Sequence, residues 1–273
     1  MGKFDDILIC TDLDGTLYRN DKTISAENKE AIEYFKAEGG YFTFITGRMP
    51  YYSRQAYHAV SPNVPFGCIN GGGLYDGKKQ EYTWNLPLAE GVEELIAHID
   101  KLFPAVGIQV CSFYKTFFCK ENEVTVNFRR LTGLSYLPGD YRNINEHKGK
   151  VLFCCAREEE ILGVEAALRA HPLAENYSFV RSEKKLFEIL PKGVNKGLSL
   201  AKLIDHLQLK DNKTIAIGDY NNDIGMFRAA RYGIAVSNAC QAAKDAADRI
   251  TVSNEQHAIA QVIRDIENGQ IQF

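Results

Sequence analysis

The sequence predicts an α/β protein with a doubly wound, Rossmann-like parallel sheet as its core and an inserted α+β cap domain. Near both ends of the chain, short apolar segments alternate with amphipathic segments of helical length, which is the pattern of βαβ units. In the middle of the chain, strands follow one another closely instead. The length of 273 residues suits either one large α/β domain or a core that carries an inserted lobe.

The N-terminal part is predicted to begin the parallel sheet. Its elements are expected in the order strand 7–11, helix 25–40, strand 41–46, helix 51–60 and strand 66–70. Ser25 is a suitable N-cap for the helix, and Gly39 with Gly40 is a suitable stop. Asn70 and the glycines at 71–73 are predicted to be a hinge into the inserted lobe, with a phosphate cradle as the alternative.

The middle part is predicted to be a separate α+β lobe, because hairpins and helices are mixed there. The expected elements are helix 89–103, hairpin 107–122, strand 149–156, helix 158–171 and strands 176–182 and 185–191.

The βαβ rhythm then returns, which indicates that the lobe interrupts a single core. The closing elements are expected as helix 195–209, strand 214–219, helix 223–233, strand 234–237 and helix 242–250. We therefore predict a core at residues 1–81 and 191–273, and a cap at residues 82–190.

Bulk properties exclude several classes of partner. The formal net charge of −3 argues against a domain that grips nucleic-acid phosphates. The sequence contains no signal-peptide pattern and no apolar run long enough to span a bilayer, so we expect a cytoplasmic protein without a membrane partner. The seven cysteines show no metal or redox spacing and are expected to be reduced and mostly buried. The oligomeric state is left open.

Polar side chains gather at the predicted carboxyl ends of strands, where open parallel sheets bind their ligands. Three segments lie at such ends: Asp12-x-Asp14-Gly15-Thr16, Thr46-Gly47-Arg48, and Gly218-Asp219 with Asn221, Asn222 and Asp223. A fourth signal, Lys196, begins the helix that precedes the last of these strands.

Carboxylates crowded at one site would repel one another unless a cation neutralised them. Hard oxygen ligands suit Mg²⁺, whereas a lysine and helix N-termini favour an anion such as phosphate. The combination predicts phosphoryl transfer. Asp12 is already ionised at neutral pH and can attack phosphorus, while Asp14 moves the proton of the leaving oxygen and later of the hydrolytic water.

The segments "DLDGT", "FITGR", Lys196 and "GDYNND" resemble, in order and spacing, the four motifs of the haloacid dehalogenase-like phosphohydrolases. The large insert after the second motif resembles the type IIB, Cof-like subgroup. This resemblance implies that Asp12 is the nucleophile and that Asp14 is the general acid/base. It also implies a Mg²⁺ site formed by Asp12, the backbone carbonyl of Asp14, Asp219 and, directly or through water, Asp223.

The same resemblance implies that Thr46 and Lys196 hold the phosphate, and we add Gly47 and Asn222 to the predicted phosphate-binding residues. The predicted function is a Mg²⁺-dependent phosphatase acting on small phosphorylated metabolites through an aspartyl-phosphate. Sugar phosphates, nucleotides and cofactor phosphates all stay open as substrates. The alternatives are a phosphotransferase, such as a sugar-phosphate mutase of the same superfamily, and a signalling module phosphorylated on aspartate.

Overall fold

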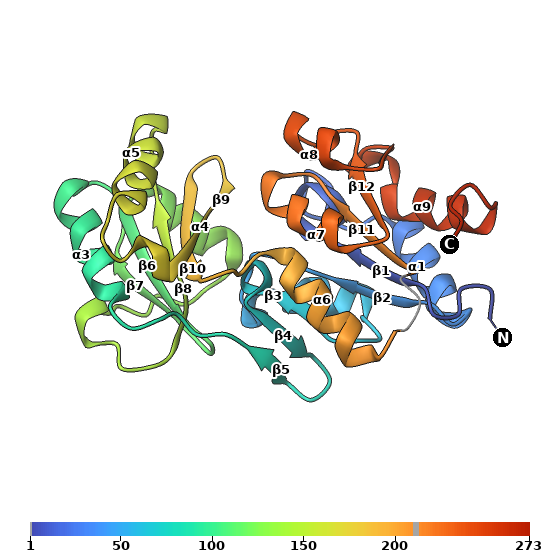
Figure 1. Cartoon of the computed structure of the whole chain (residues 1–273), viewed down its shortest axis with the longest axis horizontal. Helices are drawn as coiled ribbons and strands as arrows, with labels where there is room; N and C mark the ends of the chain where they lie inside the picture. The colour runs from blue at the N-terminus through green and yellow to red at the C-terminus, as the bar shows by residue number, and fades with distance from the viewer. Residues whose placement is uncertain (1, 210–212) are drawn as a thin grey trace. The chain divides into compact units, whose positions relative to one another are not determined.

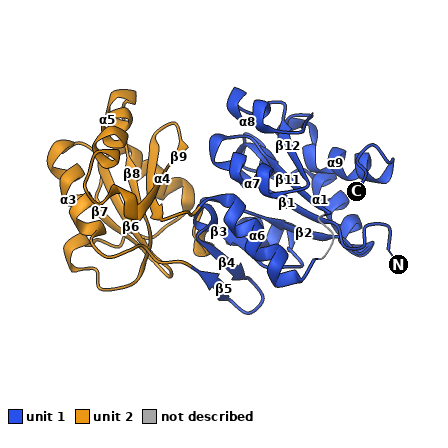
Figure 2. Ribbon diagram, viewed as in Figure 1, with its two compact units in different colours: residues 1–47, 53–85, 195–273 blue, residues 48–52, 86–194 orange. Residues whose placement is uncertain are grey.

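The computed structural model describes residues 2–209 and 213–273 (Figure 1). The chain divides into two compact units (Figure 2). The first, here called the core unit, contains residues 1–47, 53–85 and 195–273; the second, the cap unit, contains residues 48–52 and 86–194.

These boundaries differ from the predicted ones by four residues at each junction. The strand that begins at Glu81 pairs with its neighbour in the core unit and so carries the first boundary to Asn85. The second boundary follows Val194, and the short segment 48–52 belongs to the cap unit although residues of the core unit flank it on both sides.

The core unit is built on a five-stranded parallel sheet in the order β13-β12-β11-β1-β2. Its strands are β1 (Leu8–Thr11), β2 (Tyr41–Phe44), β11 (Thr214–Gly218), β12 (Tyr232–Val236) and β13 (Arg249–Thr251). Every residue of β1 and β11 is buried, so both faces of the central strands are covered, as in doubly wound folds. The α/β core with a parallel sheet is therefore confirmed.

The helices of the core unit form two groups. Its helices are α1 (Ala26–Ala37), α2 (Arg54–Val60), α6 (Lys196–Leu207), α7 (Ile224–Ala229), α8 (Gln241–Ala246) and α9 (Ala258–Glu267). Helix α1 packs on α9 and β2, whereas α7 packs on α6, α8, β11 and β12. Ser25 caps α1 as predicted, because its hydroxyl accepts a hydrogen bond from the Asn28 amide at 3.2 Å.

The predicted strand at 66–70 is confirmed as β3 (Phe66–Cys68). Its Gly67 forms a parallel bridge with Ile45, just after β2, and β3 also pairs with β4 (Gly73–Asp76) and through it with β5 (Glu81–Asn85) in a small antiparallel sheet. Two other predictions for the core were wrong. The glycines at 71–73 lead into β4 inside the core unit, so they do not form a hinge between the units. Helix α8 ends at Ala246, because the residues after it form β13 at the edge of the parallel sheet.

The cap unit has a five-stranded antiparallel sheet in the order β7-β6-β8-β10-β9. These strands are β6 (Gly107–Ser112), β7 (Thr116–Lys120), β8 (Lys148–Cys154), β9 (Tyr177–Glu183) and β10 (Leu186–Pro191). Apolar residues of α3 (Val92–Leu102) and α5 (Glu158–Arg169) form the main core with this sheet. Helix α4 (Glu123–Thr132) packs on a smaller cluster around Leu152. The predicted α+β insert is confirmed.

Two further expectations concern the chain as a whole. None of the helices in the described residues is long and apolar enough to cross a membrane. All seven cysteines are free thiols, and five of them are buried.

Candidate active site

The predicted catalytic segments meet at the carboxyl ends of β1 and β11. Asp12 directly follows β1, and its amide donates to the carbonyl of Ile217 in β11 at 2.8 Å. Asp219 directly follows β11. Because the two strands are neighbours in the parallel sheet, their register brings Asp12 and Asp219 to the same edge.

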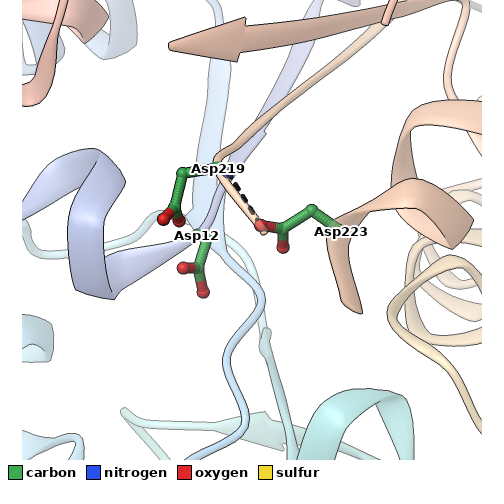
Figure 3. Close-up of side chains that lie close together, drawn as sticks. All are labelled: Asp12, Asp219 and Asp223. Atoms are coloured by element: carbon green, nitrogen blue, oxygen red, sulfur yellow. Dashed lines mark hydrogen bonds between the residues drawn. The ribbon is translucent and has the colours of Figure 1, made fainter. Parts of the chain in front are cut away.

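Three carboxylates gather at this edge, those of Asp12, Asp219 and Asp223 (Figure 3). One oxygen from each lies within 4.8 Å of the others. Asp223 is fully buried and Asp12 is 7% exposed, so water shields little of their mutual repulsion.

Backbone amides orient Asp223. Its Oδ2 accepts from the amides of Asp219 at 2.9 Å and Tyr220 at 3.0 Å, the first of which Figure 3 marks. A side chain at Gly218 would bring its Cβ within 2.5 Å of the Asp223 Cγ. Gly218, the last residue of β11, therefore leaves room for the Asp223 carboxylate, and the next residue, Asp219, contributes a carboxylate of its own.

Lys196 neutralises part of this charge. Its Nζ donates to Oδ1 of Asp12 and to Oδ1 of Asp223, both at 2.6 Å, and the side chain is 1% exposed. The lysine is the first residue of α6, whose N-cap Asn195 accepts from the Gly197 amide at 2.9 Å. The other candidate lysine of the sequence, Lys192, is exposed and belongs to the cap unit.

The turn Leu13–Leu17, which follows Asp12, is packed against Asp219. Gly15 has a φ of +81°, and a Cβ there would lie 2.5 Å from Asp219 Oδ2. The hydroxyl of Thr16 donates to Asp219 Oδ1 at 3.0 Å. The Gly-Thr pair thus provides a sharp turn and a hydrogen-bond donor for Asp219.

The pKa values reflect the crowding. Burial raises the pKa of Asp12 well above its ordinary value; Lys196 opposes this, and the charges of Asp223 and Asp219 add to it. Burial and the Asp223 charge raise the pKa of Asp219 to about 7. For Lys196, burial opposes the charged form, but the carboxylates of Asp12 and Asp223 outweigh it, so the pKa is raised.

This donor set fits a hard divalent cation. Three carboxylates face one ammonium group, so a second source of positive charge is needed before all three can ionise together. The ligands are all oxygens, as Mg²⁺ prefers, and Asp12, Asp219 and Asp223 would hold the ion.

Asp14 lies outside this carboxylate cluster. Its Oδ1 accepts from Lys22 Nζ at 2.8 Å, and its side chain is 27% exposed. The side chain is thus partly exposed to solvent and paired with Lys22. The expected role of the Asp14 backbone carbonyl as a metal ligand stays a prediction.

The predicted phosphate-binding residues Thr46, Gly47 and Asn222 are joined through Asn70. The carbonyl of Thr46 accepts from the Asn70 amide, and Asn222 Nδ2 donates to Asn70 Oδ1, both at 3.0 Å. A Cβ at Gly47 would lie 2.9 Å from Asn70 Oδ1. The sequence offered Asn70, with the three glycines after it, as a phosphate cradle, but a hinge was the preferred interpretation and Asn70 was not among the predicted site residues. The available signal was an asparagine before three glycines, a residue type that tolerates the φ of +51° observed here.

Comparisons with known proteins agree with the predicted family. The family model of the haloacid dehalogenase-like hydrolases matches residues 9–263. The 5-amino-6-(5-phospho-D-ribitylamino)uracil phosphatase YitU of Bacillus subtilis is 29% identical over 264 residues, covering 94% of this chain and 96% of that protein.

Solved structures show the same fold. A haloacid dehalogenase-like hydrolase from Bacteroides thetaiotaomicron aligns with a TM-score of 0.84 at 25% identity and covers 95% of this chain and 99% of that one. The subclass IIB sugar phosphatase BT4131 aligns with a TM-score of 0.82 at 21% identity, covering 97% of this chain and 100% of that one.

Proposed function

Since this chain belongs to the haloacid dehalogenase-like hydrolase family and is a phosphatase of small phosphorylated metabolites, we propose that Asp12 is its nucleophile and Mg²⁺ its cofactor. The observation that carries the proposal is the buried contact between Asp12 and Lys196 beside Asp219 and Asp223. A carboxylate held in this way needs no general base to become a nucleophile. When bound, Mg²⁺ would supply positive charge that lets the carboxylates ionise and screens them from the phosphate.

In the first step, an Asp12 carboxylate oxygen forms a bond to phosphorus while the bond from phosphorus to the ester oxygen breaks. The electron pair of the broken bond goes to the ester oxygen, which takes a proton from the carboxyl group of Asp14. In the second step, Asp14 takes a proton from water as the water oxygen bonds to phosphorus and the bond between phosphorus and the Asp12 oxygen breaks. The electron pair of that bond returns to Asp12, which becomes a carboxylate again while inorganic phosphate leaves.

For the substrate, we propose a phosphate ester of a sugar or sugar alcohol. Support comes from the relatives YitU and YcsE of Bacillus subtilis, both named for the phosphatase activity on 5-amino-6-(5-phospho-D-ribitylamino)uracil. That compound carries its phosphate on a primary alcohol of a ribityl chain.

The test is release of inorganic phosphate from a panel of esters, with Mg²⁺ and with chelator. The panel contains 5-amino-6-(5-phospho-D-ribitylamino)uracil, sugar phosphates, nucleotides, pyridoxal phosphate and flavin mononucleotide. Wild type is compared with Asp12→Asn, which removes the nucleophile at nearly constant volume, and with Asp205→Asn as a matched control on an exposed position of α6.

We expect Mg²⁺-dependent release by wild type and by Asp205→Asn, and a loss of about 10³-fold or more in Asp12→Asn. Full turnover by Asp12→Asn would contradict the nucleophile assignment. Isomerisation of a sugar phosphate without phosphate release would favour the mutase. An acyl-phosphate that persists for minutes after quenching would favour the signalling module.

A further inference from the structure

Two asparagine side chains hold the turn Leu13–Leu17 from outside. Asn238 Nδ2 donates to the carbonyl of Gly15 at 2.8 Å. Asn254 Nδ2 donates to the carbonyl of Tyr18, just after the turn, at 3.0 Å. The two asparagines are also bonded to each other, because the backbone amide of Asn254 donates to Asn238 Oδ1 at 2.9 Å. They form one chain of hydrogen bonds that ends on the turn.

The two asparagines come from loops at the carboxyl ends of neighbouring strands. Asn238 follows β12 and Asn254 follows β13. Asn254 is 2% exposed, and its Nδ2 also donates to Asn20 Oδ1 at 3.2 Å. A buried amide group with two acceptors has a defined orientation, so it provides a rigid support. Asn238 is exposed, and its side chain links the Asn254 backbone to the carbonyl of Gly15.

The turn depends on such support because its own backbone is irregular. Asp14 has a ψ of 120° and Gly15 a φ of +81°, which interrupt any helical pattern between Leu13 and Leu17. Glycine is also the residue with the greatest backbone freedom. The bond from Asn238 to the Gly15 carbonyl therefore restrains the peptide group between Gly15 and Thr16, one residue beyond Asp14.

We infer that Asn238 and Asn254 are positioning residues that aim Asp14 at the leaving oxygen and so determine how well the enzyme handles poor leaving groups. This inference deepens the proposed function and depends on it. Proton transfer requires hydrogen-bond distance between Asp14 and the ester oxygen, and a shift of about 1 Å is enough to lower the rate of such a step strongly. An alkoxide leaves poorly without a proton, whereas an acidic phenol leaves readily as its anion.

The test compares two substrates of different leaving group. One is the best alkyl phosphate of the panel above, and the other is p-nitrophenyl phosphate. The parameter kcat/KM reports the steps up to release of the alcohol or phenol, so it isolates the proton donation by Asp14. For Asn238→Ala we expect a fall in kcat/KM of about 10-fold for the alkyl ester and of less than about 3-fold for the aryl ester.

A second variant and a control make the result specific. Asn238→Asp keeps the Oδ1 that accepts from the Asn254 amide but loses the donor to Gly15, so it should show the same selective loss. Asn268→Ala, at an exposed position after α9, should leave both kcat/KM values unchanged. Thermal unfolding shows whether each variant is folded under the assay conditions.

An equal fall for both esters would overturn the inference, because it would indicate a general structural defect. Unchanged kcat/KM for both esters would overturn it as well. If wild type released phosphate from neither ester, the proposed function would fail first. If wild type were active and kcat/KM of the Asn238 variants fell no more for the alkyl ester than for the aryl ester, the positioning role alone would be refuted.

Discussion

Raising the pH of the metal-free protein should destabilise the core unit, because Asp219 must lose a proton in a buried site. Burial and the charge of Asp223 raise the pKa of Asp219 from 3.8 to about 7. A carboxyl group with a higher pKa in the folded state binds its proton more tightly when folded. The stabilisation is therefore complete below the unfolded pKa, and it is lost as pH rises through the range from about 4 to about 7.

The size of the effect follows from the shift. For one group that is protonated when folded and ionised when unfolded, each pH unit changes the free energy of unfolding by about 1.4 kcal/mol, and the change becomes smaller near pH 7. Asp219 therefore accounts for a loss of about 2 kcal/mol between about pH 5 and about pH 7. Other carboxyl groups titrate over the same range. The comparison is therefore made with Asp219→Asn, which has a similar shape but does not titrate, so that the common contributions cancel.

The single tryptophan of the chain, Trp84, lies in β5 of the core unit and reports unfolding of the unit that contains the site. Urea unfolding followed by its fluorescence, in chelator and at several pH values, yields the free energy of unfolding of both proteins. Wild type should lose stability relative to Asp219→Asn as pH rises. A constant difference, or a gain by wild type, would refute the reasoning.

Addition of Mg²⁺ supplies a second test of the same idea. A cation that binds the ionised carboxylates stabilises the folded state by mass action, and it does so more strongly at a pH where protons no longer compete. Saturating Mg²⁺ should therefore remove most of the pH-dependent loss in wild type and change Asp219→Asn much less. An equal effect of Mg²⁺ on both proteins would mean that Asp219 does not hold the ion.

Two further substitutions test the packing of the site. Lys196→Met leaves buried carboxylates without their ammonium partner and should lower the free energy of unfolding by about 3 kcal/mol, whereas Lys29→Met on the exposed side of α1 should change it by less than about 0.5 kcal/mol in urea unfolding. Gly15→Ala places a Cβ against Asp219 and should abolish phosphate release. Gly269→Ala has a similar φ of +70° but meets just one side-chain atom within 4 Å, at 3.8 Å, so it should keep activity; equal activity of both glycine variants would contradict the steric argument.

Much of this site could be predicted because its signals are local. An apolar β-branched strand that ends in Asp12, or in Gly218 and Asp219, is visible in a few consecutive residues. A charged residue directly after a buried strand is unfavourable without a partner, so such a pattern points to a site. The helix from Ser25 was predictable for the same reason, since an N-cap and its helix are neighbours in sequence.

The errors occurred where pairing with distant residues decided the structure. The glycines at 71–73 were predicted to be a hinge, but they lead into β4, which pairs with β3 and β5 inside the core unit. Residues 249 and 250 were predicted to end a helix, but they pair with β12 at the edge of the parallel sheet as part of β13. In both places tertiary pairing outweighed the local pattern.

The sequence by itself determined which side chains carry the chemistry and in what order they occur. The tertiary structure decided which of them meet: Lys196 reaches Asp12 across 184 positions of sequence, and Asn254 reaches the carbonyl of Tyr18 across 236. The physical reason is that these bonds depend on strand order in the sheet. That order is set by the burial of whole strands and helices together, which no short stretch of residues encodes.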